Sequence, residues 1–249
     1  MSAPTSSYDQ IGGAYSRHRR ADPRIAVRIH RALGDSRTVL NVGAGTGSYE
    51  PPGLRVTALE PSAVMVAQRQ HGAAPAVRGV SQALPFPDGA FDAAMAILTL
   101  HHWPDKEAGL AEMCRVASRR VVLTFDVAFE HSFWLVRDYL PEMADLDYGI
   151  PLSAKDVADA VGARTIDVVP VPYDCEDGFL CAYWRRPECY LDPSVQACIS
   201  GIARLDEAVV ERGMARLAAD LASGTWAERH ADLLERTQMD CGYRLVIAG

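Results

Sequence analysis

The run Thr38-Val39-Leu40-Asn41-Val42-Gly43-Ala44-Gly45-Thr46-Gly47 decides the fold class of this chain of 249 residues. Its first half is β-branched and apolar, as in a short buried strand, and it breaks directly into a loop with glycine at every second position. Glycines at 43, 45 and 47 remove Cβ atoms where the backbone turns sharply, and they let a ligand approach closely. The run therefore predicts a strand followed by a ligand-binding loop.

The next apolar run, residues 54–59, ends in Glu60. A carboxylate in this place can accept two hydrogen bonds from the hydroxyls of a ribose. A nicotinamide or flavin dinucleotide requires the spacing G-x-G-x-x-G, but Ser48 stands in the place of the third glycine and Gly47 comes one residue early. The shorter turn suits a nucleoside with a charged amino-acid tail, because there is no pyrophosphate to seat. A simple strand-to-helix turn without a ligand is the alternative interpretation.

Strands and helices alternate along most of the chain. Apolar periodicity and turn residues predict strands at 38–42, 54–59, 76–80, 91–98, 120–125, 165–171 and 243–248, and helices at 25–33, 63–70, 106–116, 133–140, 154–161, 202–221 and 226–234. This alternation predicts an α/β protein with a Rossmann-like, doubly wound, mostly parallel seven-stranded sheet whose last strand lies at the C-terminus.

A long segment separates the last two predicted strands. No repeat, low-complexity tract or linker divides the chain, so residues 1–249 are expected to form a single domain in which 172–241 is a largely helical insertion. Loops at the carboxyl ends of parallel strands build the ligand site in such folds, so we expect the insertion to be a substrate cap. Phe179, Tyr183, Trp184 and Arg185 would then form an aromatic lid with a basic edge for a planar or acidic small molecule. The alternative is an ordinary small core of the cap.

Composition excludes several classes of partner. The formal net charge of −7 gives no electrostatic reason to bind nucleic acid. The longest apolar stretch, residues 93–100, is too short to cross a bilayer and the N-terminus has no signal pattern, so we expect no membrane partner and a cytoplasmic protein. Six irregularly spaced cysteines without a C-x-x-C pattern predict no metal site. The oligomeric state stays open.

Four stretches in order, residues 39–47, 59–62, 84–92 and 98–103, resemble the class I S-adenosylmethionine (SAM) dependent methyltransferases. The group they resemble most is that of the ubiquinone/menaquinone-type small-molecule enzymes. The resemblance implies SAM as cofactor and methylation of O, N or C of a small molecule.

Carried over to this sequence, the resemblance also implies roles for single residues. The implied cofactor contacts are Gly43, Ala44, Gly45, Gly47, Glu60, Pro61, Ser62, Met65, Val80, Ser81, Gln82, Leu98 and Thr99. The glycine loop would flank the methionine part, Glu60 would hold the ribose, residues 80–82 would edge the adenine, and residues 98–99 would offer backbone oxygen to the ammonium group.

Tyr15 and Arg19 form a Tyr-x-x-x-Arg pattern that, in similar enzymes, clamps the methionine carboxylate. A solvated basic face is the alternative. Two positions depart from the family pattern, because Asn41 and Val80 stand where acids are usual. Each lost carboxylate would remove about 1.5 to 3 kcal/mol of charge-assisted hydrogen bonding. We expect Ser81, Gln82 or bound water to compensate in part; the alternative is a weaker cofactor site.

His101 and His102 follow the fourth long strand, where an acceptor would lie, and a neutral imidazole can take a proton from a hydroxyl or an ammonium group. We expect His102 rather than His101 to be the catalytic base, with Trp103 as a wall of the pocket; the alternative is a histidine pair that only packs the loop. Two other functions stay open: a SAM-binding protein that catalyses a non-methylating reaction such as cyclisation, and an NAD-dependent oxidoreductase.

Overall fold

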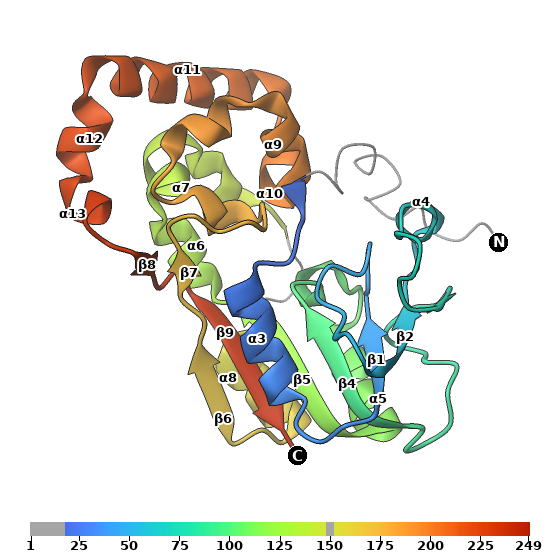
Figure 1. Ribbon diagram of the computed structural model, residues 1–249. Coiled ribbons are helices and arrows are strands. Elements are labelled where there is room, and N and C mark those ends of the chain that lie inside the picture. Colours follow the sequence, from blue (N-terminus) through green and yellow to red (C-terminus); the bar gives the residue numbers. More distant parts are fainter. Residues whose placement is uncertain (1–17, 148–151) are drawn as a thin grey trace.

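The computed structural model describes residues 18–147 and 152–249, and its centre is a seven-stranded sheet in the order β3-β2-β1-β4-β5-β9-β6 (Figure 1). The strands are β1 Thr38–Val42, β2 Arg55–Leu59, β3 Ala76–Val77, β4 Phe91–Ile97, β5 Ala117–Phe125, β6 Thr165–Val168 and β9 Tyr243–Ala248. Strands β1 to β5 pair in parallel, whereas β9 pairs antiparallel with both β5 and β6. The predicted mostly parallel sheet, with its last strand at the C-terminus, is confirmed.

Helices cover both faces of this sheet. Helix α3 (Pro23–Ala32) packs on one face, while α5 (Lys106–Val116) and α8 (Ala154–Val161) pack together on the other. Successive residues of a strand point to opposite faces. Ala93 and Met95 of β4 accordingly belong to the core under α3, and Ala94 and Ala96 belong to the core under α5 and α8. Burial on both faces explains why β4 is continuously apolar from Ala93 to Ile97.

Apart from α4 (Ala63–Ala67) and the short η1 (Leu100–His102), which follow β2 and β4, the remaining helices gather above the carboxyl ends of the parallel strands (Figure 1). Two segments supply them: α6 Val127–Ser132, α7 Trp134–Tyr139 and η2 Pro141–Asp145 follow β5, and η3 Leu180–Tyr183, η4 Pro187–Leu191, α9 Pro193–Cys198, α10 Ser200–Ala203, α11 Glu207–Ser223, α12 Thr225–Arg229 and α13 Ala231–Leu234 lie between β6 and β9. We call this group the upper helical layer. The two segments pack on each other, since Trp134 Nε1 donates to Trp184 O at 2.9 Å and its ring centroid lies 5.2 Å from that of Trp226. The core under α3 continues through these rings into the layer.

Several predicted bounds are wrong. The helix expected at 202–221 is two helices, because the Asp206 side chain accepts from Ala208 N and starts α11 anew. The strand expected at 165–171 ends at Val168, since Pro170 has no N–H to donate to β9. The strand at 76–80 ends at Val77, and helix α4 (Ala63–Ala67) is shorter than expected. A small antiparallel pair, β7 (Val171–Pro172) and β8 (Gln238–Met239), lies between the sheet and the upper layer.

Within residues 18–147 and 152–249, no helix is long and apolar enough to span a membrane. The same residues contain no group of three or more His, Cys, Asp or Glu that could hold a metal ion.

Candidate active site

A cavity of about 350 Å³ opens at the carboxyl ends of β1, β2 and β4. We call it the first cavity. The predicted residues that line it are Arg19, Gly43, Ala44, Gly45, Glu60, Pro61, Met65, Val80, Ser81, Gln82, Leu98, Thr99, His102 and Trp103. The structure thus brings together side chains and loops that are spread over more than eighty residues of sequence.

Gly43 is the tightest point of the glycine loop. Its N–H and that of Ala44 donate to Leu59 O at 2.8 and 3.0 Å, which fastens the loop to the end of β2. Its φ is +70°, a conformation that favours glycine, and a Cβ on it would overlap the Thr99 side chain. The loop therefore needs glycine here for both its turn and its close approach to the end of β4.

The Glu60 carboxylate is buried in the wall of the first cavity. One oxygen accepts from Gly45 N at 2.8 Å and the other accepts from Ser62 N at 2.9 Å. Ser62 is buried and accepts from Met65 N as the cap of α4, and it does not line the cavity. An ionised carboxylate has about four acceptor positions, so two backbone bonds are compatible with further bonds to a ligand.

Asn41, which stands where the family pattern has an acid, lies beside the carboxylate of Glu50. Its Nδ2 donates to Glu50 Oε1 at 3.3 Å, and Glu50 forms an ion pair with Arg69 at 2.5 Å. Arg69 also donates to Gly45 O at 3.1 Å, so the ion pair is hydrogen-bonded to the backbone of the glycine loop. Gly47 turns toward this ion pair and does not line the first cavity. Sequence reasoning missed Glu50, because no local pattern predicts which side chain outside the strand will accept a hydrogen bond from Asn41.

A second cavity of about 60 Å³ shares Arg19 and Leu98 with the first. Its walls come from the sheet and from the upper helical layer. The other lining residues are His101, Phe125, Glu130, Phe179, Leu180, Cys181, Cys198, Ile199, Ser200, Cys241 and Tyr243. Of these, only His101 and Phe179 were predicted. Glu130 is a buried acid in α6, shortly after the end of β5. Residues that follow the carboxyl ends of parallel strands often contribute to a ligand site, so its position in the sequence could have marked it as a candidate.

Leu98 forms the wall between the two cavities, and its backbone is strained. Its φ of +51° makes it the one residue other than glycine with positive φ in the described part of the chain. Such conformations are rare for bulky residues and collect at functional sites. The unusual backbone conformation at Leu98 therefore coincides with the point where the two cavities adjoin.

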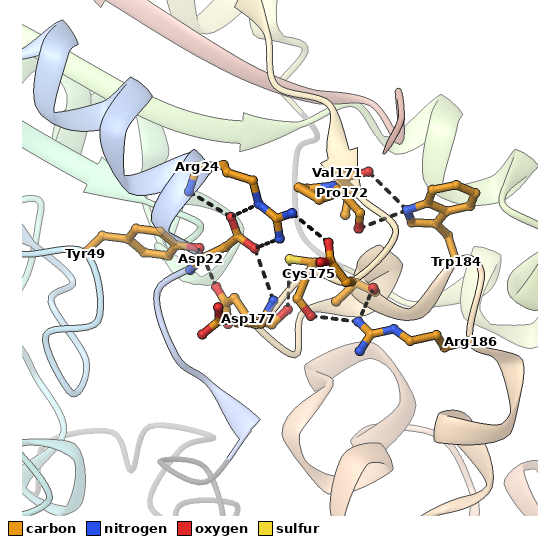
Figure 2. Close-up of polar contacts among 12 residues, drawn as sticks. Asp22, Arg24, Tyr49, Val171, Pro172, Cys175, Asp177, Trp184 and Arg186 are labelled. Carbon is orange, nitrogen blue, oxygen red and sulfur yellow. Dashed lines mark hydrogen bonds and ion pairs between the residues drawn. The ribbon is translucent and has the colours of Figure 1, made fainter. Parts of the chain in front are cut away.

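Three predicted lid residues line neither cavity. Trp184 is fully buried, and its Nε1 donates to Val171 O and Pro172 O at 3.1 and 3.2 Å (Figure 2). Tyr183 packs edge-on against Tyr190, and Arg185 donates to Arg236 O. Their contacts correspond to the alternative interpretation, a small core of the upper layer. Buried aromatic N–H groups require acceptors, and here the backbone supplies them.

Arg19 stands between both cavities and the upper layer. Its Nε donates to Asp177 Oδ1 at 2.6 Å, and its backbone forms an antiparallel bridge with Asp177. Its predicted companion, Tyr15, lies outside the described residues.

The two histidines belong to different cavities. His102 lines the first and His101 the second, and their ring centroids are 3.8 Å apart. Burial, with the positive charges of Arg19, Arg204 and Lys106 as smaller causes, lowers the pKa of His102 to about 3. Burial and the neighbouring His102 place the pKa of His101 well below its usual range. Both rings are neutral near pH 7, which makes them weak proton acceptors but good hydrogen-bond partners.

These shifts predict that the protein loses stability in acid. In the unfolded chain the two histidines have a pKa near 6.5, so they bind protons at a pH where the folded rings stay neutral. The free energy of unfolding is therefore highest above pH 6.5 and falls as the pH drops toward 3. Protonation of His102 alone should lower the free energy of unfolding by about 2 kcal/mol between pH 7 and pH 5, and His101 should act in the same direction. Urea unfolding at the two pH values measures this loss. His102→Gln should reduce it, with His131→Gln at an exposed position as control; an equal pH dependence in His102→Gln and wild type would contradict the prediction.

Comparison with known proteins agrees with this geometry. A family model described as "Methyltransferase domain" matches residues 40–125. A crystal structure from Anabaena variabilis, of a protein assigned as a methyltransferase of an antibiotic biosynthesis pathway, is 32% identical, with a TM-score of 0.85, and the match covers 93% of this chain and 99% of that one. The [4+2]-cyclase SpnF is 17% identical with a TM-score of 0.51, covering 100% of this chain and 97% of its own, which shows a shared fold. No curated protein matches the chain in sequence.

Proposed function

This chain belongs to the class I SAM-dependent methyltransferases, and from that premise we propose that it methylates O, N or C of a small molecule held in the second cavity. Its cofactor is SAM. The observation that carries the proposal is that the two cavities adjoin, since Leu98 and Arg19 line both, because methyl transfer needs the acceptor site next to the donor site. Membership of the ubiquinone-type group, a cytoplasmic location and the absence of a nucleic-acid partner stay predictions.

The residues of the first cavity suit a nucleoside with an amino-acid tail. A glycine loop without room for a Cβ gives close approach, and the buried Glu60 carboxylate is placed to accept from ribose hydroxyls. Ser81 and Gln82 supply polar groups on the wall beyond Glu60, where the adenine would lie. We propose that Arg19 meets the carboxylate of the tail, since a guanidinium can donate two parallel hydrogen bonds to it.

When bound, SAM supplies a methyl group already activated by a sulfonium. The protein's own contribution is then mainly to align the acceptor and to exclude water, and alignment alone is worth roughly 7 to 11 kcal/mol. We propose that His101, which lines the second cavity, orients the acceptor through a hydrogen bond, and that His102 assists from the adjoining first cavity. A conjugate acid with a pKa of about 3 is a poor match for proton removal near pH 7, so the role of general base is the less favoured of the two for His102.

We propose that residues 172–241 are the substrate cap of a single-domain enzyme. Phe179, Leu180 and residues 198–200 of this segment form the roof of the second cavity. Helices α6 and α7 belong to the same cap, because they pack against it and contribute Glu130 to the cavity. The continuous core from the sheet into the upper layer supports a single domain.

Methyl transfer can be tested with SAM labelled in its methyl group. The purified protein is incubated with a panel of small acceptors bearing hydroxyl, amine and acidic C–H groups; compounds from antibiotic pathways are included because the similar Anabaena protein is assigned to one. The expected result is one labelled methyl group on an acceptor and stoichiometric S-adenosylhomocysteine. An altered substrate with unchanged SAM would instead support the non-methylating alternative, and tight binding of NAD without SAM binding would overturn the proposal.

A further inference from the structure

Asp177 is a fully buried carboxylate in the insertion, and both of its oxygens are engaged by residues far away in sequence. Oδ1 accepts from Arg19 Nε at 2.6 Å, and Oδ2 accepts from the Tyr49 hydroxyl at 2.9 Å, as Figure 2 shows for Tyr49. Arg19 and Tyr49 both line the first cavity. The carboxylate therefore lies directly behind the wall of that cavity.

The backbone around this ion pair is fixed as well. Gly178 N donates to His18 O at 2.8 Å, and a Cβ on Gly178 would come within 2.9 Å of that same oxygen. On the other side, Ser48 Oγ of the glycine loop donates to Arg19 O at 3.1 Å. Arg19 is thus held between the insertion and the glycine loop, with its side chain directed by Asp177.

The geometry points to Asp177 as a positioning residue, which orients the Arg19 guanidinium toward the carboxylate of the cofactor's amino-acid tail. The insertion would then complete the cofactor site in addition to covering the acceptor. This inference rests on the proposed role of Arg19. A guanidinium carries five N–H donors in a rigid fork, so pairing through Nε with Asp177 fixes the direction in which the others point.

Tyr49 keeps the carboxylate in place. Burial and the negative charge of Asp177 raise the pKa of Tyr49 well above its usual value, so its hydroxyl stays protonated and donates. Asp177 therefore accepts one bond that anchors it and one that directs Arg19.

A second buried carboxylate offers a matched control. Asp22 is also fully buried and lies in the same contact between the N-terminal segment and the insertion, where it accepts from Glu176 N at 3.2 Å (Figure 2). Its ion pair is with Arg24 at 2.7 Å, and neither Asp22 nor Arg24 lines the two cavities. Asp22→Asn thus disturbs the same interface without touching Arg19.

The experiment compares the affinity of each variant for S-adenosylhomocysteine and for methylthioadenosine, a nucleoside that lacks the amino-acid tail. Asp177→Asn should weaken S-adenosylhomocysteine by about tenfold or more and change methylthioadenosine by less than about twofold. Asp22→Asn should leave both affinities within about twofold of wild type, even where it lowers the melting temperature. Calorimetry gives these values without turnover.

A double-mutant cycle adds a test that does not depend on Asp22. If Asp177 acts through Arg19, Asp177→Asn should change S-adenosylhomocysteine binding by less than about twofold in an Arg19→Met background. Parallel loss of both nucleosides in Asp177→Asn, the same loss in Asp22→Asn, or additive effects in the cycle would overturn the inference. Failure of wild type to bind S-adenosylhomocysteine would instead overturn the proposed function.

Discussion

Glu60→Ala is expected to weaken SAM binding by more than about tenfold, because the two ribose hydroxyls lose their acceptor and hydrogen bonds to a charged group are worth about 1.5 to 3 kcal/mol each. The change also removes the acceptor of Gly45 N and of Ser62 N, which the carboxylate joins across the cavity wall. The variant should thus lose both the ribose contacts and the hydrogen bonds that hold the glycine loop in place. Isothermal titration with SAM measures the effect.

Glu112→Ala is the matched control for this change. Glu112 also accepts a backbone N–H, that of Leu84 at 2.8 Å, but it lies outside both cavities. Glu60→Gln should bind SAM poorly as well, since its amide has one acceptor oxygen where the structure uses two. Wild-type affinity in a folded Glu60→Ala variant would show that the ribose lies elsewhere.

Gly43→Ala is expected to have the second large effect. Alanine at φ +70° costs about 1 to 2 kcal/mol, and the overlap with Thr99 adds about 1 to 3 kcal/mol, so the free energy of unfolding should fall by about 2 to 5 kcal/mol. Any folded fraction should bind SAM weakly, because the loop must move away from the end of β4. Denaturant unfolding and calorimetry measure the two effects.

Gly53→Ala separates the two causes. Gly53 has φ +83° and no atom within 4 Å of an added Cβ, so it has the conformational cost without the overlap. It should lose only about 1 to 2 kcal/mol and keep its SAM affinity. Equal losses at Gly43 and Gly53 would mean that close approach at Gly43 has no importance.

The elements of the sheet could be predicted because their signals are local. Strand β4 is apolar without a break from Ala93 to Ile97, and β1 ends in the glycine loop, so apolar patterning and turn residues were sufficient. The bounds failed where one residue outweighed the pattern, as with Asp206 inside an otherwise continuous helical stripe. Helix propensity could not show whether the capping residue Asp206 or the continuous apolar stripe would decide where the helix begins.

The candidate site also has a part that the sequence predicts and a part that it does not. The first cavity follows from motifs at strand ends, and most of its predicted residues meet there. The second cavity depends on how the upper layer packs, and the sequence could not separate Phe179, which lines it, from Trp184, which is buried in the core. Asp177 and Glu50 accept hydrogen bonds from residues elsewhere in the sequence, Arg19 and Asn41, and only the folded chain reveals these contacts.

The most direct test of the account is the position of S-adenosylhomocysteine in a crystal structure of its complex with this protein. The expected result places the ligand in the first cavity, with the ribose hydroxyls within hydrogen-bond distance of Glu60 and the amino-acid tail between the glycine loop and Arg19. A ligand bound elsewhere, or a ribose that does not contact Glu60, would contradict it.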